Sequence, residues 1–398
     1  MEHKTRIKGN VHYVGVNDRN KHRFEGMWPL PYGVSYNSYL IDDEMVALID
    51  TVDICYFEVY LRKIRNIIGD RPINYLIINH MEPDHSGSIR LIKQHYPDIV
   101  IVGNKQTFGM IEGFYGVTGE QYLVKEGDFL ALGHHKLRFY MTPMVHWPET
   151  MMTFDETDGV LFSGDGFGCF GTVDGGFLDT RINVDKYWGE MVRYYSNIVG
   201  KYGSPVQKAL QKLGGLPISA ICSTHGPVWT ENIAKVIGIY DRLSRYDADE
   251  GVVIAYGSMY GNTEQMAEAI AEELSAQGVK NIVMHNVTKS HPSYIIADIF
   301  RYKGLIIGSP TYSNQIFPEV EALLSKILLR EVKGRYLGYF GSFTWAGAAV
   351  KRLAEFAEKS KFELVGDPVE MKQAMKDLTY TQCENLARAM ADRLKKDR

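Results

Sequence analysis

The stretch Tyr75-Leu-Ile-Ile-Asn-His80-Met-Glu82-Pro-Asp84-His85 is the most informative part of the chain. Its first five residues form a short apolar run that fits a buried strand. The six residues that follow contain two histidines, a glutamate and an aspartate. Because alternate residues of an extended loop point to the same side, we expect His80, Glu82 and Asp84 to converge. Imidazole and carboxylate groups without a nearby thiolate suit a divalent transition metal.

Three further candidate ligands occur later in the chain. His146 lies in PMVHWPE, Asp165 in LFSGDGFG and His225 in ICSTHGP. Each follows a strand-like apolar run and has Gly or Pro close by, which is where a rigid scaffold presents ligands from loops. A lone histidine or carboxylate is more often an ordinary polar residue. Four candidates within six residues, followed by three more in similar settings, favour a metal centre.

The loop resembles that of the metallo-β-lactamase fold, whose hydrolases bind two zinc ions through a His-x-His-x-Asp-His loop and later His, Asp and His ligands. Glu82 stands where those hydrolases have their second histidine. A carboxylate in place of an imidazole hardens the site and adds negative charge, which favours iron. His-x-Glu-x-Asp-His is the loop of the flavodiiron family, and the spacing of the later ligands agrees with that family.

The resemblance implies two non-haem iron ions with seven ligands. The residue that matches His85 does not bind iron in every relative. The expected ligands form two sets and a bridge: His80, Glu82 and His146 for one iron, Asp84, His85 and His225 for the other, and Asp165 between them.

Two segments near the expected metal pocket depart from the family pattern. Many relatives have Phe-His-Gly where this chain has Phe-Glu25-Gly, and Phe-Gly-Gln-His where it has Phe-Gly-Cys169-Phe. We expect Glu25 to replace the missing histidine as a hydrogen-bonding group beside the ligands. Tyr195 matches a family tyrosine that points into the pocket. It could equally be an ordinary aromatic residue of a helix over residues 187–199.

The second half of the chain has three polar loops, each at the end of a strand-like run. Residues 258–263 (SMYGNT) open a helix, whose N-terminal N–H and hydroxyl groups can bind a phosphate. Residues 309–314 (SPTYSN) and 341–347 (GSFTWAG) follow two further strands, where open α/β sheets bind ligands. The first loop alone could be a plain capped helix. The three loops together resemble those of flavodoxins, in the same order, and predict bound FMN.

We expect the flat faces of Tyr312 and Trp345 to pack against the flavin ring. The GxGxxG fingerprint is absent, so neither NAD nor FAD is expected as a resident cofactor. The predicted FMN-binding residues are Ser258, Met259, Tyr260, Gly261, Asn262, Thr263, Ser309, Pro310, Thr311, Tyr312, Asn314, Ser342, Phe343, Thr344, Trp345, Ala346 and Gly347.

A chain of 398 residues is too long for one typical core and predicts two domains. Strand and helix patterns alternate after the polar stretch 246–250, which predicts a doubly wound parallel sheet. With the resemblance, the expected fold class is α/β. We expect a metallo-β-lactamase-like αββα sandwich over residues 1–249 and a flavodoxin-like domain over residues 250–398.

The composition limits which binding partners and which cellular compartment we expect. A net charge of −4 and a pI near 6.3 give no reason to expect nucleic acid binding. The N-terminus lacks the pattern of a signal peptide, and no apolar run is long enough to span a membrane. The four cysteines form no C-x-x-C pair, which argues against a disulfide scaffold or an added rubredoxin-like module. We therefore expect a cytoplasmic protein.

The resemblance implies an oxidoreductase in which FMN passes electrons to the two irons. These reduce dioxygen to water or nitric oxide to nitrous oxide, and the sequence does not choose between the two gases. The resemblance also implies a head-to-tail homodimer, or a dimer of dimers, in which the FMN of one subunit lies beside the iron site of the other. A separate electron donor is expected: rubredoxin, a flavoprotein reductase or a reduced deazaflavin.

Two other interpretations stay open. One is a dinuclear zinc hydrolase fused to a flavodoxin-like domain, against which Glu82 argues. The other is an electron carrier without catalytic activity, against which the full set of seven ligands argues. Metal content would separate the carrier from the enzyme, and zinc with esterase or thioesterase activity would support the hydrolase.

Overall fold

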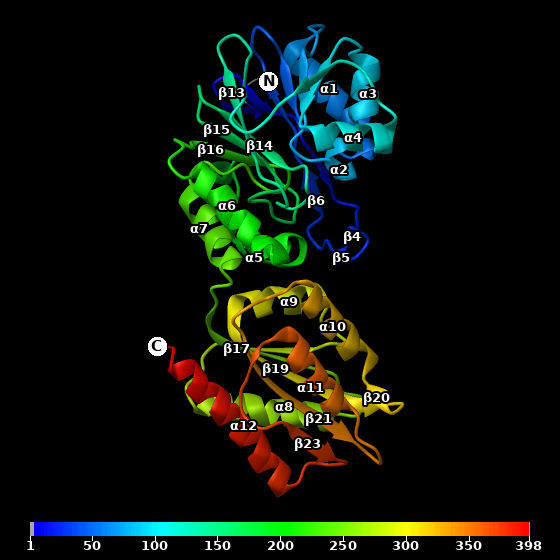
Figure 1. Ribbon diagram of the computed structural model, residues 1–398, viewed down its shortest axis with the longest axis vertical. Helices are drawn as coiled ribbons and strands as arrows, with labels where there is room; N and C mark the ends of the chain where they lie inside the picture. Colours follow the sequence, from blue (N-terminus) through cyan, green and yellow to red (C-terminus); the bar gives the residue numbers. More distant parts are fainter. Residues whose placement is uncertain (1–3, 398) are drawn as a thin grey trace. The chain divides into compact units, whose positions relative to one another are not determined.

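The computed structural model describes residues 4–397 of the chain, which form two compact units (Figure 1). Unit 1 ends at Ser244, and the rest of the chain belongs to unit 2. The boundary expected from the sequence falls slightly later, inside strand β17 (Asp249–Tyr256). The polar stretch before this strand is part of unit 2, because the buried guanidinium of Arg335 donates a hydrogen bond of 2.9 Å to the Tyr246 carbonyl.

Unit 1 is a sandwich of two sheets, as the sequence predicted. The first sheet is mixed and has the strand order β1 (Arg6–Lys8), β2 (Val11–Tyr13), β7 (Tyr39–Ile41), β8 (Ala47–Ile49), β9 (Tyr75–Ile77), β10 (Val100–Gly103), β11 (Gln121–Leu123). The second has the order β12 (Phe129–Ala131), β13 (Lys136–Met141), β14 (Met151–Asp155), β15 (Val160–Gly164), β16 (Ala220–Ser223). Apolar side chains of both sheets, such as Ile77 and Phe162, share one core.

Helices cover both outer sides of this sandwich. Helices α1, α3 and α4 gather on one side of unit 1, and α6 and α7 on the other (Figure 1). Helix α1 shows why: its buried residues Phe57, Leu61 and Ile64 recur at helical spacing. The helices of unit 1 are η2 (Ile54–Tyr56), α1 (Phe57–Ile68), α2 (Pro83–Ser86), α3 (Ile89–His95), α4 (Lys105–Tyr115), η3 (Asp179–Arg181), α5 (Asp185–Tyr194), the π-helix η4 (Tyr195–Val199), η5 (Gly200–Tyr202), α6 (Gly203–Leu213) and α7 (Ile233–Ser244).

Two short antiparallel ribbons complete unit 1. Their buried side chains include Phe24 and Tyr36, which both lie beside His225, with ring centroids 5.2 and 6.1 Å from its ring. The ribbons pair β3 (Val16–Asp18) with β6 (Val34–Tyr36), and β4 (Arg23–Phe24) with β5 (Trp28–Pro29).

Unit 2 is the predicted doubly wound sheet. Its main strands are parallel, in the order β18 (Ile282–Asn286), β17, β19 (Tyr302–Tyr312), β21 (Tyr336–Phe343), with β22 (Glu363–Leu364) and β23 (Val369–Lys372) both beside β21 and the short β20 (Gln315–Ile316) antiparallel to β19. Helices α8 and α12 pack together on the sheet through residues such as Ile270 and Leu386. The helices are α8 (Asn262–Ala276), α9 (Pro292–Arg301), α10 (Pro318–Leu329), α11 (Ala349–Ser360) and α12 (Asp377–Lys395).

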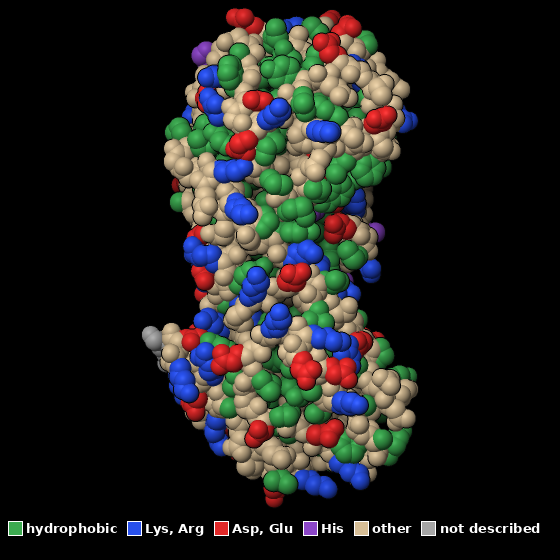
Figure 2. Space-filling model, in the orientation of Figure 1, with side chains coloured by type: hydrophobic (Ala, Val, Ile, Leu, Met, Phe, Trp, Pro, Cys, Tyr) green, Lys and Arg blue, Asp and Glu red, His purple; other side chains and the backbone are tan. Residues whose placement is uncertain are grey.

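Acidic and basic side chains are interspersed on the surface of each unit in the view of Figure 2. Within residues 4–397, none of the helices combines the length and the hydropathy that a membrane crossing requires.

Candidate metal centre and cofactor pocket

The loop after β9 presents its ligands from two different local structures. His80 lies in the extended segment that leaves the strand, whereas Asp84 and His85 lie in the short helix α2. Proline at the first position of α2 starts this helix, because its fixed φ suits a helix and its missing N–H costs nothing there. Asp84 therefore joins the centre from the first turn of α2 and not from an extended loop, in a group with His85 and His225.

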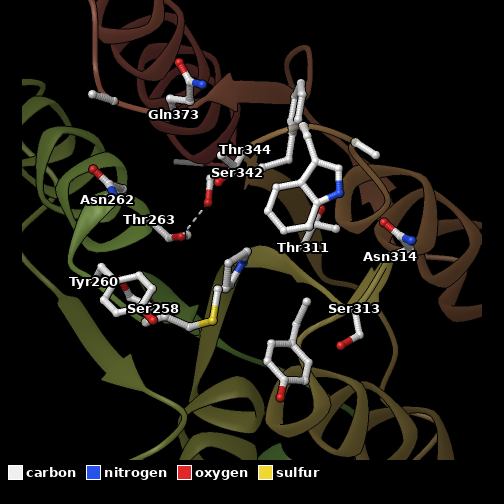
Figure 3. Close-up of a pocket in the computed structure, with 17 residues that line it drawn as sticks. Ser258, Tyr260, Asn262, Thr263, Thr311, Ser313, Asn314, Ser342, Thr344 and Gln373 are labelled. Carbon is white, nitrogen blue, oxygen red and sulfur yellow. Dashed lines mark hydrogen bonds between the residues drawn. The ribbon is translucent and has the colours of Figure 1, made fainter.

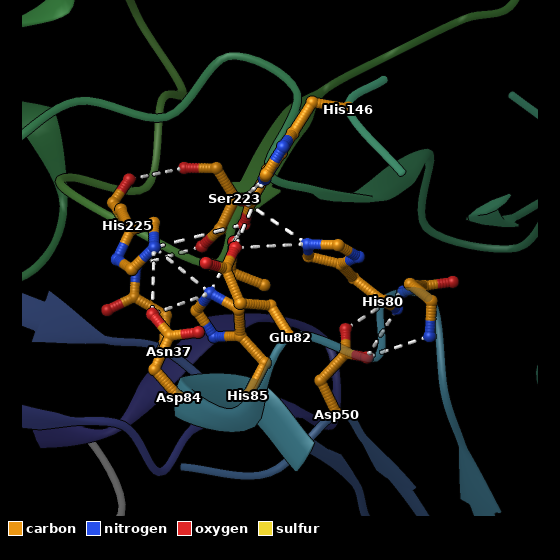
Figure 4. A network of polar contacts seen from close by, with 12 residues as sticks. Asn37, Asp50, His80, Glu82, Asp84, His85, His146, Ser223 and His225 are labelled. Atoms are coloured by element: carbon orange, nitrogen blue, oxygen red, sulfur yellow. Dashed lines mark hydrogen bonds and ion pairs between the residues drawn. The ribbon is translucent and has the colours of Figure 1, made fainter. Parts of the chain in front are cut away.

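The structure brings all seven predicted ligands together in two adjacent groups. Figure 4 labels all of them except Asp165. In the first group, His146 Nε2 lies 3.1 Å from Glu82 Oε2, and His80 Nε2 lies 3.4 Å from the same oxygen. The groups are His80, Glu82, His146 and Asp165 on one side, and Asp84, His85 and His225 on the other.

Asp165 joins the two groups through its two oxygens. Its Oδ2 lies 3.1 Å from His146 Nε2, and its Oδ1 lies 3.2 Å from His85 Nε2. His85 Nε2 in turn lies 3.0 Å from His225 Nε2. One carboxylate thus faces both groups at once, as the bridging position requires.

The second group fits a cation better than it fits a set of hydrogen bonds. Both carboxylate oxygens of Asp84 are buried without a hydrogen-bond partner among the described residues. A buried carboxylate left without partners costs free energy. The nearest ring nitrogens, on His85 and His225, lie 3.3 and 3.4 Å from Asp84 Oδ2. Nitrogen and oxygen lone pairs that face one another in this way suit a divalent ion such as iron.

The pKa values of ligands from both groups also indicate that the centre needs positive charge. Burial raises the pKa of Asp84 to about 8, and the nearby charge of Glu82 adds to this. Burial also opposes the charged form of His146, but hydrogen bonds to Asp165 and Glu82 outweigh it and raise its pKa to about 9. Without metal, protons therefore supply the positive charge that the carboxylates need. A divalent ion would take over that part.

Two buried carboxylates outside the predicted set hold His80 in place. Glu149 Oε1 accepts hydrogen bonds of 2.9 Å from His80 Nδ1 and from the Met81 N–H. Asp50 Oδ1 accepts the Asn79 N–H at 2.7 Å and the His80 N–H at 3.3 Å. A metal-binding histidine commonly donates its second N–H to such a carboxylate, which fixes the ring and raises its basicity. Glu149, three residues after His146, could have been found by that rule.

His225 and Asp165 are also held from outside the ligand set. The Ser35 carbonyl lies 2.8 Å from His225 Nδ1, so the other ring nitrogen, Nε2, faces the ligands. The Thr224 hydroxyl donates a hydrogen bond to Asp165 Oδ1. Ser35 belongs to β6 and precedes His225 by 190 residues, and no sequence pattern indicated this contact.

The tyrosine at the centre is Tyr194, whereas the sequence pointed to Tyr195. The Tyr194 ring lies 5.6 Å from that of His225, and burial followed by the charge of Asp165 raises its pKa well above the ordinary value. Tyr195 packs against Tyr240 at 5.1 Å. Consecutive helical residues point about 100° apart, so a shift of one position changes the neighbours completely. The π-helix η4 starts at Tyr195, and such segments are frequent at functional sites.

The role expected for Glu25 beside the ligands stays a prediction. Its side chain is exposed, and its carboxylate accepts a hydrogen bond of 2.9 Å from the Trp28 indole. The chain has a positive φ of 48° at Glu25, in the tight turn between β4 and β5. This turn directs Phe24 inward and Glu25 outward.

An aromatic wall, formed by Phe24, Phe170 and Tyr194, closes one side of the centre. Phe170 lies 5.5 Å from Phe24 and 5.0 Å from Tyr194, ring to ring. Cys169, the other departure from the family pattern, is buried over Gly226, where a side chain would collide with its sulfur. The two departures thus make this side of the centre apolar.

Unit 2 contains a cavity of about 640 Å³ at the carboxyl ends of β17, β19 and β21 (Figure 3). This volume suits a ligand of cofactor size. Its lining includes all but three of the predicted FMN-binding residues: Ser258, Met259, Tyr260, Asn262, Thr263, Pro310, Thr311, Tyr312, Asn314, Ser342, Phe343, Thr344, Trp345 and Ala346.

The remaining three predicted residues support the cavity without lining it. Gly261 has a φ of 87° and precedes α8, and its N–H donates to the Ser258 hydroxyl at 3.2 Å. The Ser309 hydroxyl accepts the Phe317 N–H at 3.3 Å. A side chain at Gly347 would collide with Glu370.

The sequence prediction missed three lining residues, Ser313, Gln373 and Ala374. The last two follow β23, which lies beside β21 and brings a fourth strand end to the cavity. Gln373 and Ala374 belong to no recognisable motif. Only the strand order could have indicated them.

The chemistry of the cavity fits FMN. Thr263, in the first turn of α8, has its hydroxyl 2.8 Å from that of Ser342 (Figure 3). Hydroxyl groups at a helix N-terminus suit a phosphate. The rim is aromatic and open: Tyr260 is 89% exposed and Trp345 80% exposed.

Two family models match the chain, one in each unit. "ODP family beta lactamase" matches residues 34–226 and "Flavodoxin" matches residues 254–385. An anaerobic nitric oxide reductase flavorubredoxin from Escherichia coli O1:K1 is 32% identical over 364 residues, which cover 90% of this chain and 76% of that protein.

Solved structures match nearly the whole chain. The rubredoxin oxygen:oxidoreductase of Desulfovibrio gigas has a TM-score of 0.94 and 31% sequence identity, with 98% of each chain covered. The flavodiiron protein of Giardia intestinalis has a TM-score of 0.91 and 27% identity, with 98% of this chain and 97% of that chain covered. Together with the paired ligand groups and the flavodoxin-like cavity, these matches show that the chain belongs to the flavodiiron protein family.

Proposed function

We propose that the chain reduces dioxygen to water or nitric oxide to nitrous oxide at two irons in unit 1, with FMN in unit 2 as the electron source. The position of Asp165 carries the proposal, because its two oxygens face the two ligand groups separately. A carboxylate shared by two nitrogen and oxygen ligand sets suits a pair of redox-active cations. Two relatives that match most of the chain are named as a nitric oxide reductase and an oxygen oxidoreductase.

The residues of this chain would prepare the site in three ways. When bound, FMN and the irons supply electron transfer and binding of the diatomic gas. Glu149 and Asp50 fix His80, so that its Nε2 faces the centre. The aromatic wall excludes water beside His225. The Tyr194 hydroxyl, buried next to Asp165, is placed to donate a hydrogen bond into the centre.

The FMN would be held by its phosphate at one end and by aromatic residues at the other. Ser258, Asn262 and Thr263 would bind the phosphate at the start of α8. Tyr312 and Trp345 would pack against the ring system, which leaves the exposed rim next to the reactive part of the flavin.

That rim supports a head-to-tail homodimer. Large exposed apolar groups that surround a redox cofactor mark a surface that a partner covers. A second copy of the chain would cover it with its iron-containing unit, and two-fold symmetry would form both contacts at once. A separate protein, such as rubredoxin or a flavoprotein reductase, would reduce the FMN. The four cysteines are unpaired, which supports a reducing compartment such as the cytoplasm.

The zinc hydrolase is the less favoured alternative. Glu82 replaces an imidazole with a carboxylate in the first ligand group. The relatives that cover most of the chain are named as reductases.

The test is gas consumption by protein that holds iron and FMN, with a chemical reductant, at oxygen and nitric oxide electrodes. We expect steady consumption of at least one gas. A His146→Ala variant that keeps FMN but loses iron should consume at least about tenfold less. No consumption of either gas by protein with both cofactors bound and reduced would refute the proposal. Thioester hydrolysis by the zinc-loaded protein would then favour the hydrolase.

A further inference from the structure

Tyr36 lies beside two ligands of the second group, His85 and His225. Its side chain is fully buried, and its ring lies 6.4 Å from that of His85 and 6.1 Å from that of His225. Its hydroxyl has no hydrogen-bond partner among the described residues. Such a group is rare in a folded protein and calls for a partner.

Asp84 is the other member of this arrangement. Both of its oxygens are also buried without hydrogen-bond partners, and its charge is the strongest nearby charge acting on the Tyr36 hydroxyl. Tyr115, a second phenol near Asp84, is already bound, because its hydroxyl lies 2.6 Å from that of Ser86. Tyr36 is therefore the phenol that is available on the side of Asp84, whereas the Tyr194 hydroxyl lies near Asp165.

The surroundings of Tyr36 lead from the centre to the surface. Its ring lies 6.3 Å from that of the half-buried Tyr56, whose hydroxyl bonds to Asp18. Lys21 Nζ lies 5.3 Å from the Tyr36 ring centroid and 3.3 Å from Asp53 Oδ2. Lys21 is 32% exposed, so this cluster of Lys21, Asp18, Asp53 and Tyr56 meets solvent.

The aromatic wall beside His225 is apolar. Its residues Phe24 and Phe170 are buried, and the nearby Glu25 carboxylate accepts a hydrogen bond from the Trp28 indole. Both gas reductions consume protons: four with four electrons per dioxygen, and two with two electrons per pair of nitric oxide molecules.

We propose that Tyr36 donates a hydrogen bond to the group bound beside Asp84 and passes it protons from the Lys21, Asp18, Asp53 and Tyr56 cluster. In each transfer, the Tyr36 hydroxyl gives its proton inward and receives one from the Tyr56 side, directly or through a water molecule. The exposed cluster then takes up a replacement proton from solvent, so both phenols are neutral before and after each transfer. The proton supply rests on the proposed function, whereas the hydrogen bond does not.

Azide binding tests the hydrogen bond without turnover. Azide, a small anion that binds ferric iron, is titrated into oxidised, iron-loaded protein and followed by absorption. We expect Tyr36→Phe to keep its iron and to bind azide about tenfold more weakly, because a hydrogen bond to an anion is lost. Tyr187→Phe is the control, since that buried hydroxyl bonds to the Thr172 carbonyl. It should leave the azide affinity unchanged. Equal azide affinity in Tyr36→Phe and the wild type would overturn the proposal.

Turnover in H₂O and D₂O tests the proton path. We expect Tyr36→Phe to slow gas consumption at least about tenfold and to raise the solvent isotope effect, with the rate of FMN reduction unchanged. Tyr56→Phe, which removes a half-buried hydroxyl, should also slow gas consumption and raise the solvent isotope effect, by smaller amounts. It should leave the azide affinity unchanged. If Tyr36→Phe loses iron, Tyr56→Phe decides: a normal isotope effect would overturn the path. If the wild type consumes no gas, the proposed function fails, and azide still reports on Tyr36.

Discussion

Glu149 shows how a single residue can tune the centre without being a ligand. It accepts the His80 Nδ1–H and the Met81 N–H. Glu149→Gln can keep both hydrogen bonds through its amide oxygen but removes the negative charge. We therefore expect iron affinity about tenfold lower, and up to about 100-fold lower for Glu149→Leu. Competition with a chelator measures the iron affinity of each variant.

The matched control for this change is Glu156→Gln. Glu156 is a surface glutamate that pairs with Arg138 and Lys136, away from the seven ligands. Its substitution should not change iron affinity. Equal iron affinities in Glu149→Leu and Glu156→Gln would show that the charge behind His80 has no effect on the metal.

At the scale of elements, His135 joins three segments of unit 1. It precedes β13, its N–H donates to Asp43 of the β7–β8 turn, and its Nδ1 lies 2.9 Å from Asp155 at the end of β14. Burial lowers the pKa of His135, but the hydrogen bond to Asp155 and the charges of Asp155 and Asp158 outweigh it and raise the pKa above its usual value. Its stabilising effect is therefore complete below the unfolded pKa of about 6.5 and is lost as pH rises through the folded pKa.

We expect His135→Gln to lower the free energy of unfolding by about 1–2 kcal/mol at pH 6 and by less at pH 9. Urea unfolding followed by tryptophan fluorescence reports on unit 1, because four of the five tryptophans precede Ser244. The control is His134→Gln, since His134 is exposed. A loss that grows with pH would contradict the assigned direction of the pKa shift.

For the whole molecule, the question is whether electrons cross between subunits. One subunit would carry His146→Ala and lack iron, and the other would carry Thr263→Glu, whose charge repels the FMN phosphate. Co-expression with two different tags allows the mixed dimer to be purified. In a head-to-tail dimer it keeps one complete pair of FMN and iron site, so we expect about half of the wild-type gas consumption.

The parent homodimers of this experiment should both be nearly inactive. An inactive mixed dimer that still contains FMN and iron would show that electrons pass within one subunit. Activity equal to half of the wild type at all dilutions that keep the dimer intact would support the head-to-tail arrangement.

The chemistry of the chain was readable from the sequence because its signals are local. The ligands cluster in one loop and in three strand-end loops, and all seven lie together in the structure. The three flavin loops end neighbouring parallel strands, and most of their residues line one cavity. The comparisons confirmed the fold class and the family. Both could be predicted because local loop motifs and alternating patterns are retained at about 30% identity.

Only the tertiary structure determined the directions of side chains and the contacts between segments that are far apart in the sequence. The turn of α2 groups Asp84 with His85 and His225, and one step of helix α5 puts Tyr194 at the centre in place of Tyr195. Asp50, just after β8, and Tyr36, on β6, lie beside ligands that are 30 or more residues away along the chain. A sequence pattern records which residue types are near one another along the chain, whereas side-chain direction and long-range packing are set only when the two sheets close on their shared core.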